Sequence, residues 1–351
     1  MYEVKPFGAV NGQDVPVIRL SDGVCTAELL PLGAAVRSLW VPDRAGQPTD
    51  ICLGYDDLDC YRTLDACLGA TIGRCANRIG GARFTIDGRE YQVTANEGTN
   101  SLHGGAEGFH QKLWRFACRG NSVAFSLESP DGEEGFPGNL RVEVTYTLEN
   151  AALTIDYRAV SDKTTVVNLT NHTYFNLDGG GDVLGQKLRI YASRYLEGNN
   201  ETCPTGNILP VAGTPMDFRA GKPIGRDIDT GFSQTTMVGG GYDHCFVIDR
   251  GRGASQSLCA WASSDKTGIS MKVYTTQPGV QLYTGNFLQD CPAPGKGGVP
   301  MQKYGGFALE TQHFPCSPSH PEFPSTALRA GKVFRANTTL RFFTGKQCGK
   351  L

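Results

Sequence analysis

Apolar and polar residues alternate along most of this chain, and alternation with a period of two is the pattern of a half-buried β-strand. The alternation is clearest over residues 140–150 and 152–160, and it recurs over 268–277 and 332–345 near the C-terminus. Helical periodicity is almost absent, and residues 56–62 form the best short helix candidate. The pattern therefore predicts a protein built almost entirely of strands.

Turn signals between these segments indicate how the strands connect. Residues 83–93 contain Asp87-Gly88 between two short alternating arms, which predicts a hairpin with a type I′ turn. Many short strands with frequent turns favour an all-β fold, an antiparallel β-sandwich or barrel, over alternating strands and helices. No linker or fixed repeat divides the sequence, so we expect a single domain over residues 1–351.

Composition and charge narrow the class of protein. Hydrophobic residues make up 40% of the 351 residues and charged residues 19%, which is typical of an ordinary soluble globular protein. The net charge is -2 and Lys and Arg occur singly, so the chain lacks the basic surface that nucleic acid or an anionic membrane requires. No stretch approaches the roughly 20 apolar residues of a membrane span. We expect no nucleic-acid or membrane partner.

The N-terminus and the cysteines favour a cytoplasmic protein. The start of the chain lacks the basic residues and the apolar run of a signal peptide. The 12 cysteines occur singly, without a C-x-x-C pair, and Cys60, Cys67 and Cys75 lack the usual spacing of zinc ligands. We therefore expect reduced thiols, no bound metal and a cytoplasmic location, with disulfides or a metal as the alternatives.

The segment NLTNHTYFNL, residues 168–177, allows two interpretations. It contains overlapping N-x-[ST] sequons at Asn168 and Asn171, which would mark a glycosylated surface segment of a secreted protein. As a strand, it places only hydrogen-bonding residues on one face, with His172 at the centre of that face. His172 is then either a packed structural histidine or part of a functional site. The missing signal peptide argues against glycosylation.

Two glycine-rich segments carry further polar residues. In residues 69–81, Asn77 and Arg78 lie among small residues, and the flanking glycines would let a ligand approach the backbone. In residues 100–105, His103 precedes two glycines. Each segment has a structural alternative, in which Arg78 is a salt-bridged surface residue and His103 a turn residue.

Three predicted strands in the second half of the chain carry polar groups on a face with small residues. In residues 305–314, Glu310 lies on such a face, so its carboxylate is either exposed to solvent or buried at a site. Asp243 begins an apolar strand in residues 241–248, where the alternative is a turn-capping role. Gln281 lies on a strand face from which its amide can reach a ligand.

Together these segments supply histidines, carboxylates, an arginine and several amides. Planar polar side chains of this kind suit a neutral, hydroxyl-rich ligand such as a sugar. The sequence lacks a glycine-rich phosphate loop before a helix, and it lacks the G-x-S-x-G nucleophile elbow. The residues alone therefore indicate a sugar-like ligand and acid/base chemistry.

Seven motifs, in order along nearly the whole chain, resemble those of the aldose 1-epimerases, the galactose mutarotases. They are GRCANRI (73–79), SLHGG with GFHQKLW (101–114), NLTNHTYFNL (168–177), GTPMDFR (213–219), GYDHCF (241–246), TTQPGVQLYTGN (275–286) and LETQHFP (309–315). The resemblance implies one large antiparallel β-sandwich of the supersandwich type, with the sugar in a cleft across its concave face.

The resemblance also implies roles for individual residues. Glu310 matches the general base of the family and His172 its general acid. Sugar-binding roles fall on Asn77, Arg78, His103, Asp243 and Gln281. The implied partner is a small-molecule aldohexose, with no cofactor and no metal. The oligomeric state, monomer or weak dimer, stays open.

Three positions depart from the family pattern. Cys75 stands where an aromatic or aliphatic residue is common, Cys316 where Asp is common, and His110 where Asp is frequent. None of these changes removes a proposed catalytic group, although Cys316 can alter a contact to the loop beyond Glu310.

One base and one acid suffice to open a pyranose ring, because the C1 hydroxyl loses a proton while the ring oxygen gains one. This assignment requires nearby carboxylates such as Asp243 to keep His172 charged.

The alternatives are a hexose-6-phosphate mutarotase, which needs more basic residues than Arg74 and Arg78, and a glycoside hydrolase using Glu310 and Asp243. The third alternative is a non-catalytic sugar-binding β-sandwich, and the intact acid and base argue against it. The residues do not distinguish glucose from galactose.

Overall fold

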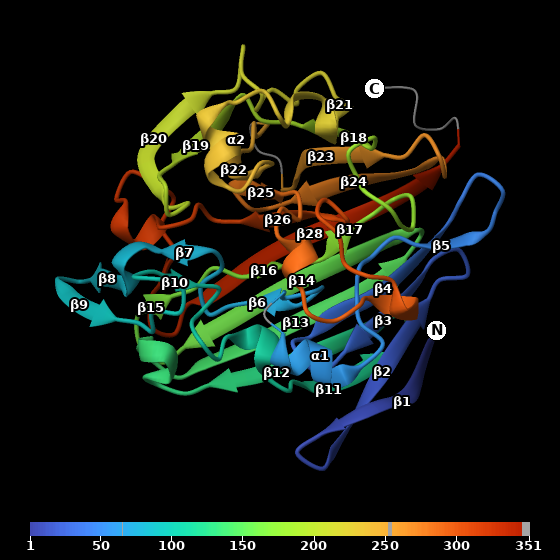
Figure 1. The fold of residues 1–351 in the computed structure, drawn as a ribbon. Helices are drawn as coiled ribbons and strands as arrows, with labels where there is room; N and C mark the ends of the chain where they lie inside the picture. The colour runs from blue at the N-terminus through green and yellow to red at the C-terminus, as the bar shows by residue number, and fades with distance from the viewer. Residues whose placement is uncertain (65, 252–254, 346–351) are drawn as a thin grey trace.

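Three antiparallel sheets and four short strand pairs form the computed structural model, which describes residues 1–64, 66–251 and 255–345 (Figure 1). The nine-stranded sheet has the order β11-β12-β13-β14-β28-β24-β23-β18-β21, and the six-stranded sheet has the order β17-β26-β25-β22-β19-β20. A five-stranded sheet contains β1 to β5 in sequence order. Neighbouring strands within each sheet are antiparallel.

The strands have the following bounds. The nine-stranded sheet contains β11 (Arg115–Arg119), β12 (Ser122–Ser129), β13 (Leu140–Glu149), β14 (Ala152–Ser161), β28 (Val333–Thr344), β24 (Ile269–Thr275), β23 (Ser257–Ser263), β18 (Lys187–Ile190) and β21 (Lys222–Pro223). The six-stranded sheet contains β17 (Tyr174–Phe175), β26 (Phe307–Gln312), β25 (Gly279–Tyr283), β22 (Asp243–Val247), β19 (Arg194–Gly198) and β20 (Pro204–Pro210). The five-stranded sheet contains β1 (Tyr2–Val10), β2 (Gln13–Ser21), β3 (Thr26–Leu30), β4 (Ala35–Pro42) and β5 (Pro48–Asp50). The short pairs are β6 (Thr71–Ile72) with β16 (Thr170–Asn171), β7 (Arg78–Ile79) with β10 (Ser101–Leu102), β8 (Arg83–Ile86) with β9 (Arg89–Gln92), and β15 (Thr165–Val166) with β27 (Ala327–Leu328).

Helices are short in the described part of the chain. The α-helices are α1 (Leu58–Thr63) and α2 (Ser233–Met237), and the 3-10 helices are η1 (Gly80–Ala82), η2 (Phe109–Gln111), η3 (Glu133–Gly135), η4 (Ile224–Asp227), η5 (Leu288–Asp290), η6 (Lys296–Gly298) and η7 (Ser317–Ser319). None of these described helices has both the length and the apolar character needed to cross a bilayer.

The strands expected from alternation are confirmed. The four long segments predicted as strands are β13, β14, β24 and β28. The predicted hairpin is β8 with β9, and its turn residues Asp87 and Gly88 have φ of 52° and 76°, as a type I′ turn requires. The predicted short helix is α1, which begins after Asp57, whose side chain accepts a hydrogen bond from the N–H of Asp59.

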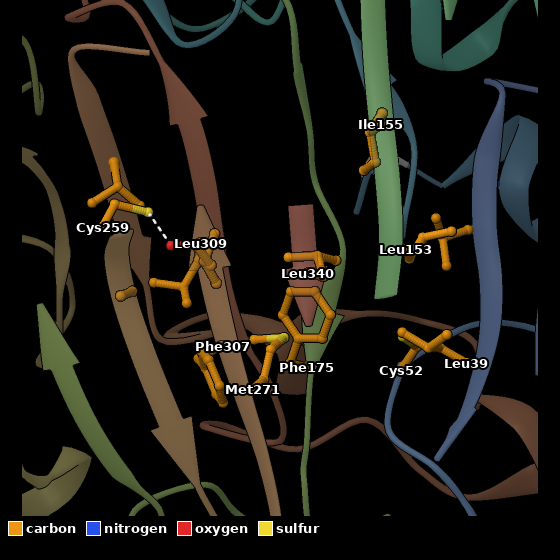
Figure 2. Packing of buried hydrophobic residues seen from close by; sticks show 14 of the residues in the cluster. Leu39, Cys52, Leu153, Ile155, Phe175, Cys259, Met271, Phe307, Leu309 and Leu340 are labelled. Atoms are coloured by element: carbon orange, nitrogen blue, oxygen red, sulfur yellow. Dashed lines mark hydrogen bonds between the residues drawn. The ribbon is translucent and has the colours of Figure 1, made fainter. Parts of the chain in front are cut away.

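The main hydrophobic core lies between the sheets and draws side chains from Ile18 to Phe342. Figure 2 shows Leu340 of β28 next to Phe175 of β17, whose ring centroid lies 6.0 Å from that of Phe307 in β26. Burying one such side chain contributes roughly 1.5–3 kcal/mol, so the packing fixes which face of β26 is turned toward the nine-stranded sheet.

Packing across the core sets the direction of Glu310. The hydroxyl of Thr311 in β26 hydrogen-bonds to that of Thr338 in β28 at 2.5 Å, and Leu309 belongs to the main core. Because successive side chains of a strand point to opposite faces, Glu310 is turned away from the nine-stranded sheet. Both faces of β26 are buried, so Glu310 is not a solvent-exposed carboxylate.

The segment 168–177 differs from the continuous strand expected from its pattern. It forms two short strands, β16 and β17, and His172 lies between them. The interruption arises because β16 pairs with β6 whereas β17 pairs with β26, so the chain passes from a separate two-stranded pair into the six-stranded sheet. The expected single regular strand is therefore wrong, and the chain is interrupted at His172.

The two sequons of this segment do not fit a glycosylated surface. Asn168 is 1% exposed, and its amide donates hydrogen bonds to the carbonyls of Ala76 and His313. The amide of Asn171 donates to the carbonyl of Gly69 at 2.7 Å. Both amides are hydrogen-bonded within the fold, so the glycosylation interpretation is wrong for the folded chain.

Candidate functional site

A cavity of about 220 Å³ lies over the face of the six-stranded sheet that carries Glu310. Its volume is below the roughly 300–1,000 Å³ typical of sites for drug-sized molecules, which suits a ligand the size of a monosaccharide. Its polar lining is Asn77, Arg78, Glu97, His103, His172, Asp243 and Glu310, and its aromatic lining is Tyr174, Tyr283 and Phe287. A larger hollow of about 410 Å³ on the outer face of the nine-stranded sheet is lined by exposed charges that pair with one another, such as Arg141 with Glu128. The candidate site is therefore identified by the residues that line the smaller cavity and not by cavity volume.

Asn77 and His103 hold each other in place beside β7 and β10. The N–H of His103 donates to the carbonyl of Asn77 at 3.1 Å, and the N–H of Asn77 donates to Nδ1 of His103 at 3.2 Å. Both residues have positive φ, of 58° and 54°, a conformation that is uncommon away from glycine and recurs at functional sites. Gly104 follows with φ of 94°, and a Cβ there would lie 2.1 Å from the carbonyl oxygen of Gly73. Since Nδ1 of His103 is an acceptor, the proton of the neutral imidazole lies on Nε2.

His172 and Glu310 form a buried pair at the base of the cavity. Nε2 of His172 lies 3.6 Å from Oε1 of Glu310, and the two side chains are 7% and 2% exposed. The backbone of His172 is held on both sides, because its N–H donates to Ala70 and its carbonyl accepts from Gly69. Its ring packs against Tyr174 with centroids 4.8 Å apart. The pair therefore has a fixed geometry before any ligand arrives.

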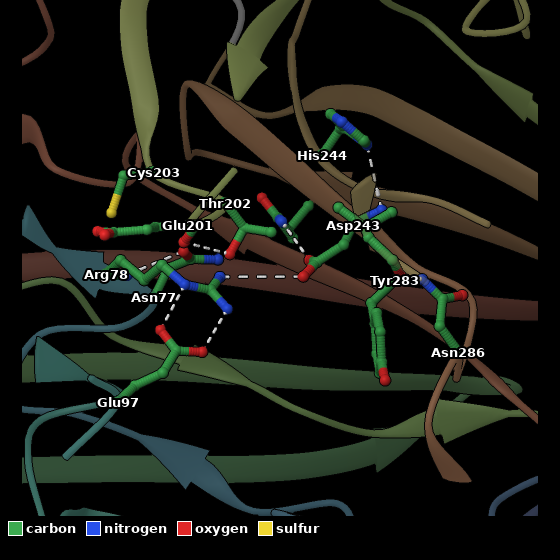
Figure 3. A network of polar contacts seen from close by, with 12 residues as sticks. Asn77, Arg78, Glu97, Glu201, Thr202, Cys203, Asp243, His244, Tyr283 and Asn286 are labelled. Atoms are coloured by element: carbon green, nitrogen blue, oxygen red, sulfur yellow. Dashed lines mark hydrogen bonds and ion pairs between the residues drawn. The ribbon is translucent and has the colours of Figure 1, made fainter. Parts of the chain in front are cut away.

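A polar network forms one wall of the cavity (Figure 3). Arg78 binds Glu97 through two hydrogen bonds of 2.7 and 2.6 Å, and its Nη1 lies 3.9 Å from Oδ2 of Asp243. Gln281 donates to Oδ1 of Asp243 at 2.7 Å. Arg78 is thus salt-bridged, as the structural alternative expected, but it lies in the cavity wall and is only 8% exposed.

Burial dominates the ionisation of the pair. Burial lowers the pKa of His172 to about 4, although Asp243 opposes this shift. Burial and the charge of Asp243 raise the pKa of Glu310 well above its usual range, and Arg78 opposes that shift. The expectation that nearby carboxylates keep His172 charged is therefore contradicted, because desolvation outweighs Asp243.

Buried polar atoms without partners mark where a ligand would bind. Oε2 of Glu310, Nδ1 of His172 and Oε1 of Gln281 have no hydrogen-bond partner among the described residues. Buried polar groups are nearly always hydrogen-bonded, so such atoms need an explanation. A hydroxyl-rich ligand or water in this region would supply the missing partners.

The side chains of His103, His172 and Glu310 in the cavity also resemble a metal-ligand set. Potential ligand atoms of His103, His172 and Glu310 lie within 4.8 Å of one another. However, Nδ1 of His103 already accepts the N–H of Asn77, so Nε2 keeps its proton. Neither nitrogen of that ring then offers a lone pair to a cation, and the cluster fits hydrogen bonding better than metal binding.

The structure brings together the residues singled out from the sequence. Six of the seven line the cavity, and Gln281 lies beside it through its bond to Asp243. Sequence reasoning missed Glu97 and Phe287, which lie in irregular segments without a periodic signal. It could have found Tyr174, which lies two residues after His172 on the predicted polar face.

Comparison with known proteins decides the family. The family model for aldose 1-epimerase matches residues 16–341 of the chain. The chain belongs to the aldose 1-epimerase family. It is 41% identical over 334 residues to the galactose mutarotase of Rattus norvegicus, covering 95% of each chain. It is 38% identical over 349 residues to the aldose 1-epimerase of Escherichia coli, covering 97% of this chain and 99% of the relative.

Solved structures in the aldose 1-epimerase family share the fold. The GalM/aldose epimerase homologue from C. elegans has a TM-score of 0.87 and 32% identity, covering 93% of this chain and 98% of that one. The galactose 1-epimerase from Lactobacillus acidophilus has a TM-score of 0.86 and 28% identity, covering 98% and 99%. The predicted all-β, galactose mutarotase-like sandwich is confirmed.

Three residues at which this aldose 1-epimerase family member departs from the expected pattern lie outside the cavity lining. Cys75 is buried, and its backbone forms an isolated parallel β-bridge with Asn168 in the neighbouring segment. His110 is buried in η2. Cys316 precedes η7, and its N–H donates to the carbonyl of Arg78 at 2.8 Å. Cys316 therefore contacts the backbone of a cavity residue.

Proposed function

We propose that this protein is an aldose 1-epimerase, a mutarotase that interconverts the α and β anomers of free aldohexoses such as glucose and galactose. The observation that carries the proposal is the buried pair of His172 and Glu310, with Nε2 and Oε1 3.6 Å apart at a cavity of monosaccharide size. Family membership supports the same reaction, since the relatives bear the names galactose mutarotase and aldose 1-epimerase.

The pair supplies both proton transfers that ring opening needs. Glu310 acts as the base that takes the proton of the C1 hydroxyl, and His172 acts as the acid that protonates the ring oxygen. The C1–O5 bond then breaks and leaves a free aldehyde. Rotation about C1–C2 presents the other carbonyl face, and closure reverses both transfers. The products contain the same atoms and protons as the substrate, and the pair returns to its initial state.

The cycle requires one proton on the pair. The directions of the two pKa shifts favour that proton on Glu310 and a neutral His172. A bound sugar offers a hydroxyl donor to Glu310 and a ring-oxygen acceptor to His172. Hydrogen bonds to the charged forms favour them, so sugar binding moves the proton from Glu310 to His172. The active ionisation state is then formed only when substrate is present.

The remaining polar residues bind and orient the sugar in this proposal. His103 donates from Nε2, Arg78 donates from its guanidinium, and Asn77 contributes its amide. Asp243 accepts hydroxyl protons, and Gln281 fixes the carboxylate of Asp243 through their 2.7 Å hydrogen bond. Planar groups of this kind hold several hydroxyls at once, which prevents the sugar from rotating during proton transfer.

A sugar phosphate fits the site less well than a free sugar. A phosphate dianion requires cationic donors that are not already neutralised. Arg78 supplies the guanidinium among the described cavity residues. Glu97 already binds this group through two hydrogen bonds. Arg74 is buried away from the cavity and donates to the backbone carbonyls of Pro137 and Gly138.

We further propose that residues 1–351 act as one domain, because the main core joins strands from β2 to β28. A cytoplasmic location is also a proposal, and it rests on cysteine usage: the cysteines of the described residues form no disulfide.

The direct test is polarimetry on freshly dissolved α-D-glucose and α-D-galactose. Acceleration over buffer by the wild-type protein supports the proposal. Including the 6-phosphates of both sugars tests the phosphate alternative, which a higher kcat/KM for the phosphates would favour. Sugar binding by calorimetry without any acceleration would instead indicate a non-catalytic sugar-binding protein.

We expect kcat/KM to be constant around neutral pH and to fall at both extremes. Below about pH 4, His172 becomes protonated while Glu310 keeps its proton, so no base remains. Above the raised pKa of Glu310 the pair has lost its proton, so no acid remains. Polarimetric rates at each pH, after subtraction of the buffer reaction, measure the profile. An activity that falls steadily from neutral pH toward pH 5 would contradict this account.

Replacing His103 by Asn should raise KM about tenfold and change kcat little, because the contact is equally strong in substrate and transition state. Asn adopts positive φ readily, and its side-chain oxygen can replace Nδ1 as the acceptor for Asn77. Initial rates at varied sugar concentration separate the two constants. A fall in kcat at unchanged KM would place His103 in the proton-transfer machinery instead.

A further inference from the structure

Two thiols that the proposed reaction does not use meet behind Arg78. Cys203 lies just before β20, and Cys316 lies just before η7. The thiols are hydrogen-bonded to each other. A methyl group built on Gly80 would lie 3.7 Å from Sγ of Cys316 and 3.9 Å from Sγ of Cys203, so both sulfurs flank the same residue. Two turns that are distant in sequence therefore present adjacent thiols.

One turn contacts the backbone of Arg78 directly, and the other lies beside the same segment at Gly80. The N–H of Cys316 donates to the carbonyl of Arg78 at 2.8 Å, and Gly80 lies two residues beyond Arg78. On the other side, Glu201 accepts a hydrogen bond from the amide of Asn100 at 3.0 Å. Figure 3 shows Cys203 and Glu201 next to Arg78. A change in the distance between the two turns would therefore be transmitted to Arg78.

The two thiols differ in reactivity. The hydrogen bond from Cys316 lowers the pKa of Cys203, burial opposes this shift, and the charge of Arg78 reinforces it. The same hydrogen bond and burial raise the pKa of Cys316. Thiolates, not thiols, are the nucleophiles, so Cys203 reacts first. Cys203 is itself buried, with 6% of its surface exposed against 3% for Cys316, but it directly follows Glu201 and Thr202, which are more exposed.

We propose that Cys203 and Cys316 are a peroxide-sensitive pair, and that their oxidation to a disulfide weakens sugar binding by displacing Arg78. The Cys203 thiolate attacks a hydroperoxide, which breaks the O–O bond, releases an alkoxide or hydroxide, and leaves a sulfenic acid. The Cys316 thiol then displaces water from that sulfenic acid and forms the S–S bond. Two thiols are oxidised and one peroxide is reduced to water and an alcohol, or to two waters for hydrogen peroxide.

The expected effect follows from geometry. A disulfide requires the sulfurs to approach to about 2.05 Å, which is shorter than any thiol hydrogen bond. The turns before β20 and η7 must then move together, and the N–H of Cys316, which donates to the carbonyl of Arg78, moves with its turn. His172 belongs to neither turn, so binding should suffer more than proton transfer. The kinetic part of this inference rests on the proposed function.

The experiment treats the intact, reduced protein with hydrogen peroxide and follows two independent readouts. Tryptic peptides analysed by mass spectrometry, without reduction, identify the linked cysteines. Polarimetry gives KM and kcat before treatment, after it, and after dithiothreitol. The variants are Cys316→Ser, Cys203→Ser, and as a matched control Cys118→Ser, a partly exposed thiol on β11 of the nine-stranded sheet.

We expect a peptide linking Cys203 to Cys316 and a KM raised at least about fivefold, with kcat changed less than about twofold. Dithiothreitol should reverse the change, Cys316→Ser should abolish it, and Cys118→Ser should retain it. Absence of the linked peptide overturns the proposal, and so does an equal rise of KM in Cys316→Ser. If Cys316→Ser does not fold, Cys203→Ser provides the same comparison. The mass spectrum does not depend on activity, so a reduced protein that fails to accelerate mutarotation would refute the proposed function separately.

Discussion

Replacing Glu310 by Gln is expected to lower kcat for mutarotation at least about 100-fold, within the range for a positioned acid or base. Gln keeps the shape of the side chain and can still accept a hydrogen bond from the C1 hydroxyl. It cannot take the proton, so ground-state binding should survive while ring opening fails. KM should therefore change much less than kcat. Polarimetry on α-D-galactose, with the enzyme concentration raised to compensate, measures both constants.

The same substitution should leave the fold intact. Burial raises the pKa of Glu310, so between its unfolded and folded pKa values the folded state binds more protons than the unfolded state. The wild-type protein therefore loses stability as the pH rises through that interval, and Glu310→Gln does not. The variant should unfold thermally at or above the wild-type temperature at pH 8. Glu143→Gln, on an exposed position of β13, is the matched control and should keep full activity. Near-normal turnover in Glu310→Gln would refute the role of the carboxylate.

Replacing His172 by Asn is expected to have a comparable effect on kcat, because an amide cannot deliver a proton to the ring oxygen. Asn is shorter and uncharged, and it can still donate a hydrogen bond, so loss of activity would reflect the missing acid. His320→Asn is the matched control, since His320 pairs with Glu322 outside the cavity. A decrease of less than about tenfold in His172→Asn would indicate that another group protonates the sugar.

Combining the two substitutions tests whether the residues act as a unit. Removing both members of an interdependent pair costs little more than removing one. The double variant should therefore retain about the activity of the weaker single variant. If the two losses multiply, His172 and Glu310 act independently, and the shared-proton account of the pair is wrong.

The sequence predicts the strands of this protein well, because alternation reports directly on burial. β13, β14 and β28 have one buried and one more exposed face, and their pattern is correspondingly regular. Residues 168–177 are harder to predict, since both faces of that segment are buried, apart from the partly buried Asn171, and its strand partners change at His172. A period of two cannot reveal a change of partner.

The sequence predicts which residues form the candidate site better than it predicts their ionisation. His172 and Glu310 could be singled out because a polar residue inside an apolar strand is costly unless it has a use. Their ionisation could not, because it depends on desolvation, which outweighs the charge of Asp243 at His172 and adds to it at Glu310. The partnership of Arg78 with Glu97 joins an irregular segment to β7, and no local pattern encodes such a long-range ion pair.

The direction of Glu310 depends on β28, the last strand of the nine-stranded sheet along the chain, through the contact of Thr311 with Thr338. The other half of the site, including Asn77, is encoded more than two hundred residues earlier. Contacts between such distant segments form late in folding, since the long intervening loop must first be closed. A nascent chain still missing its final strand would thus contain every proposed catalytic side chain without the means to align them. Recovery of activity after denaturation then reports on completion of the whole fold.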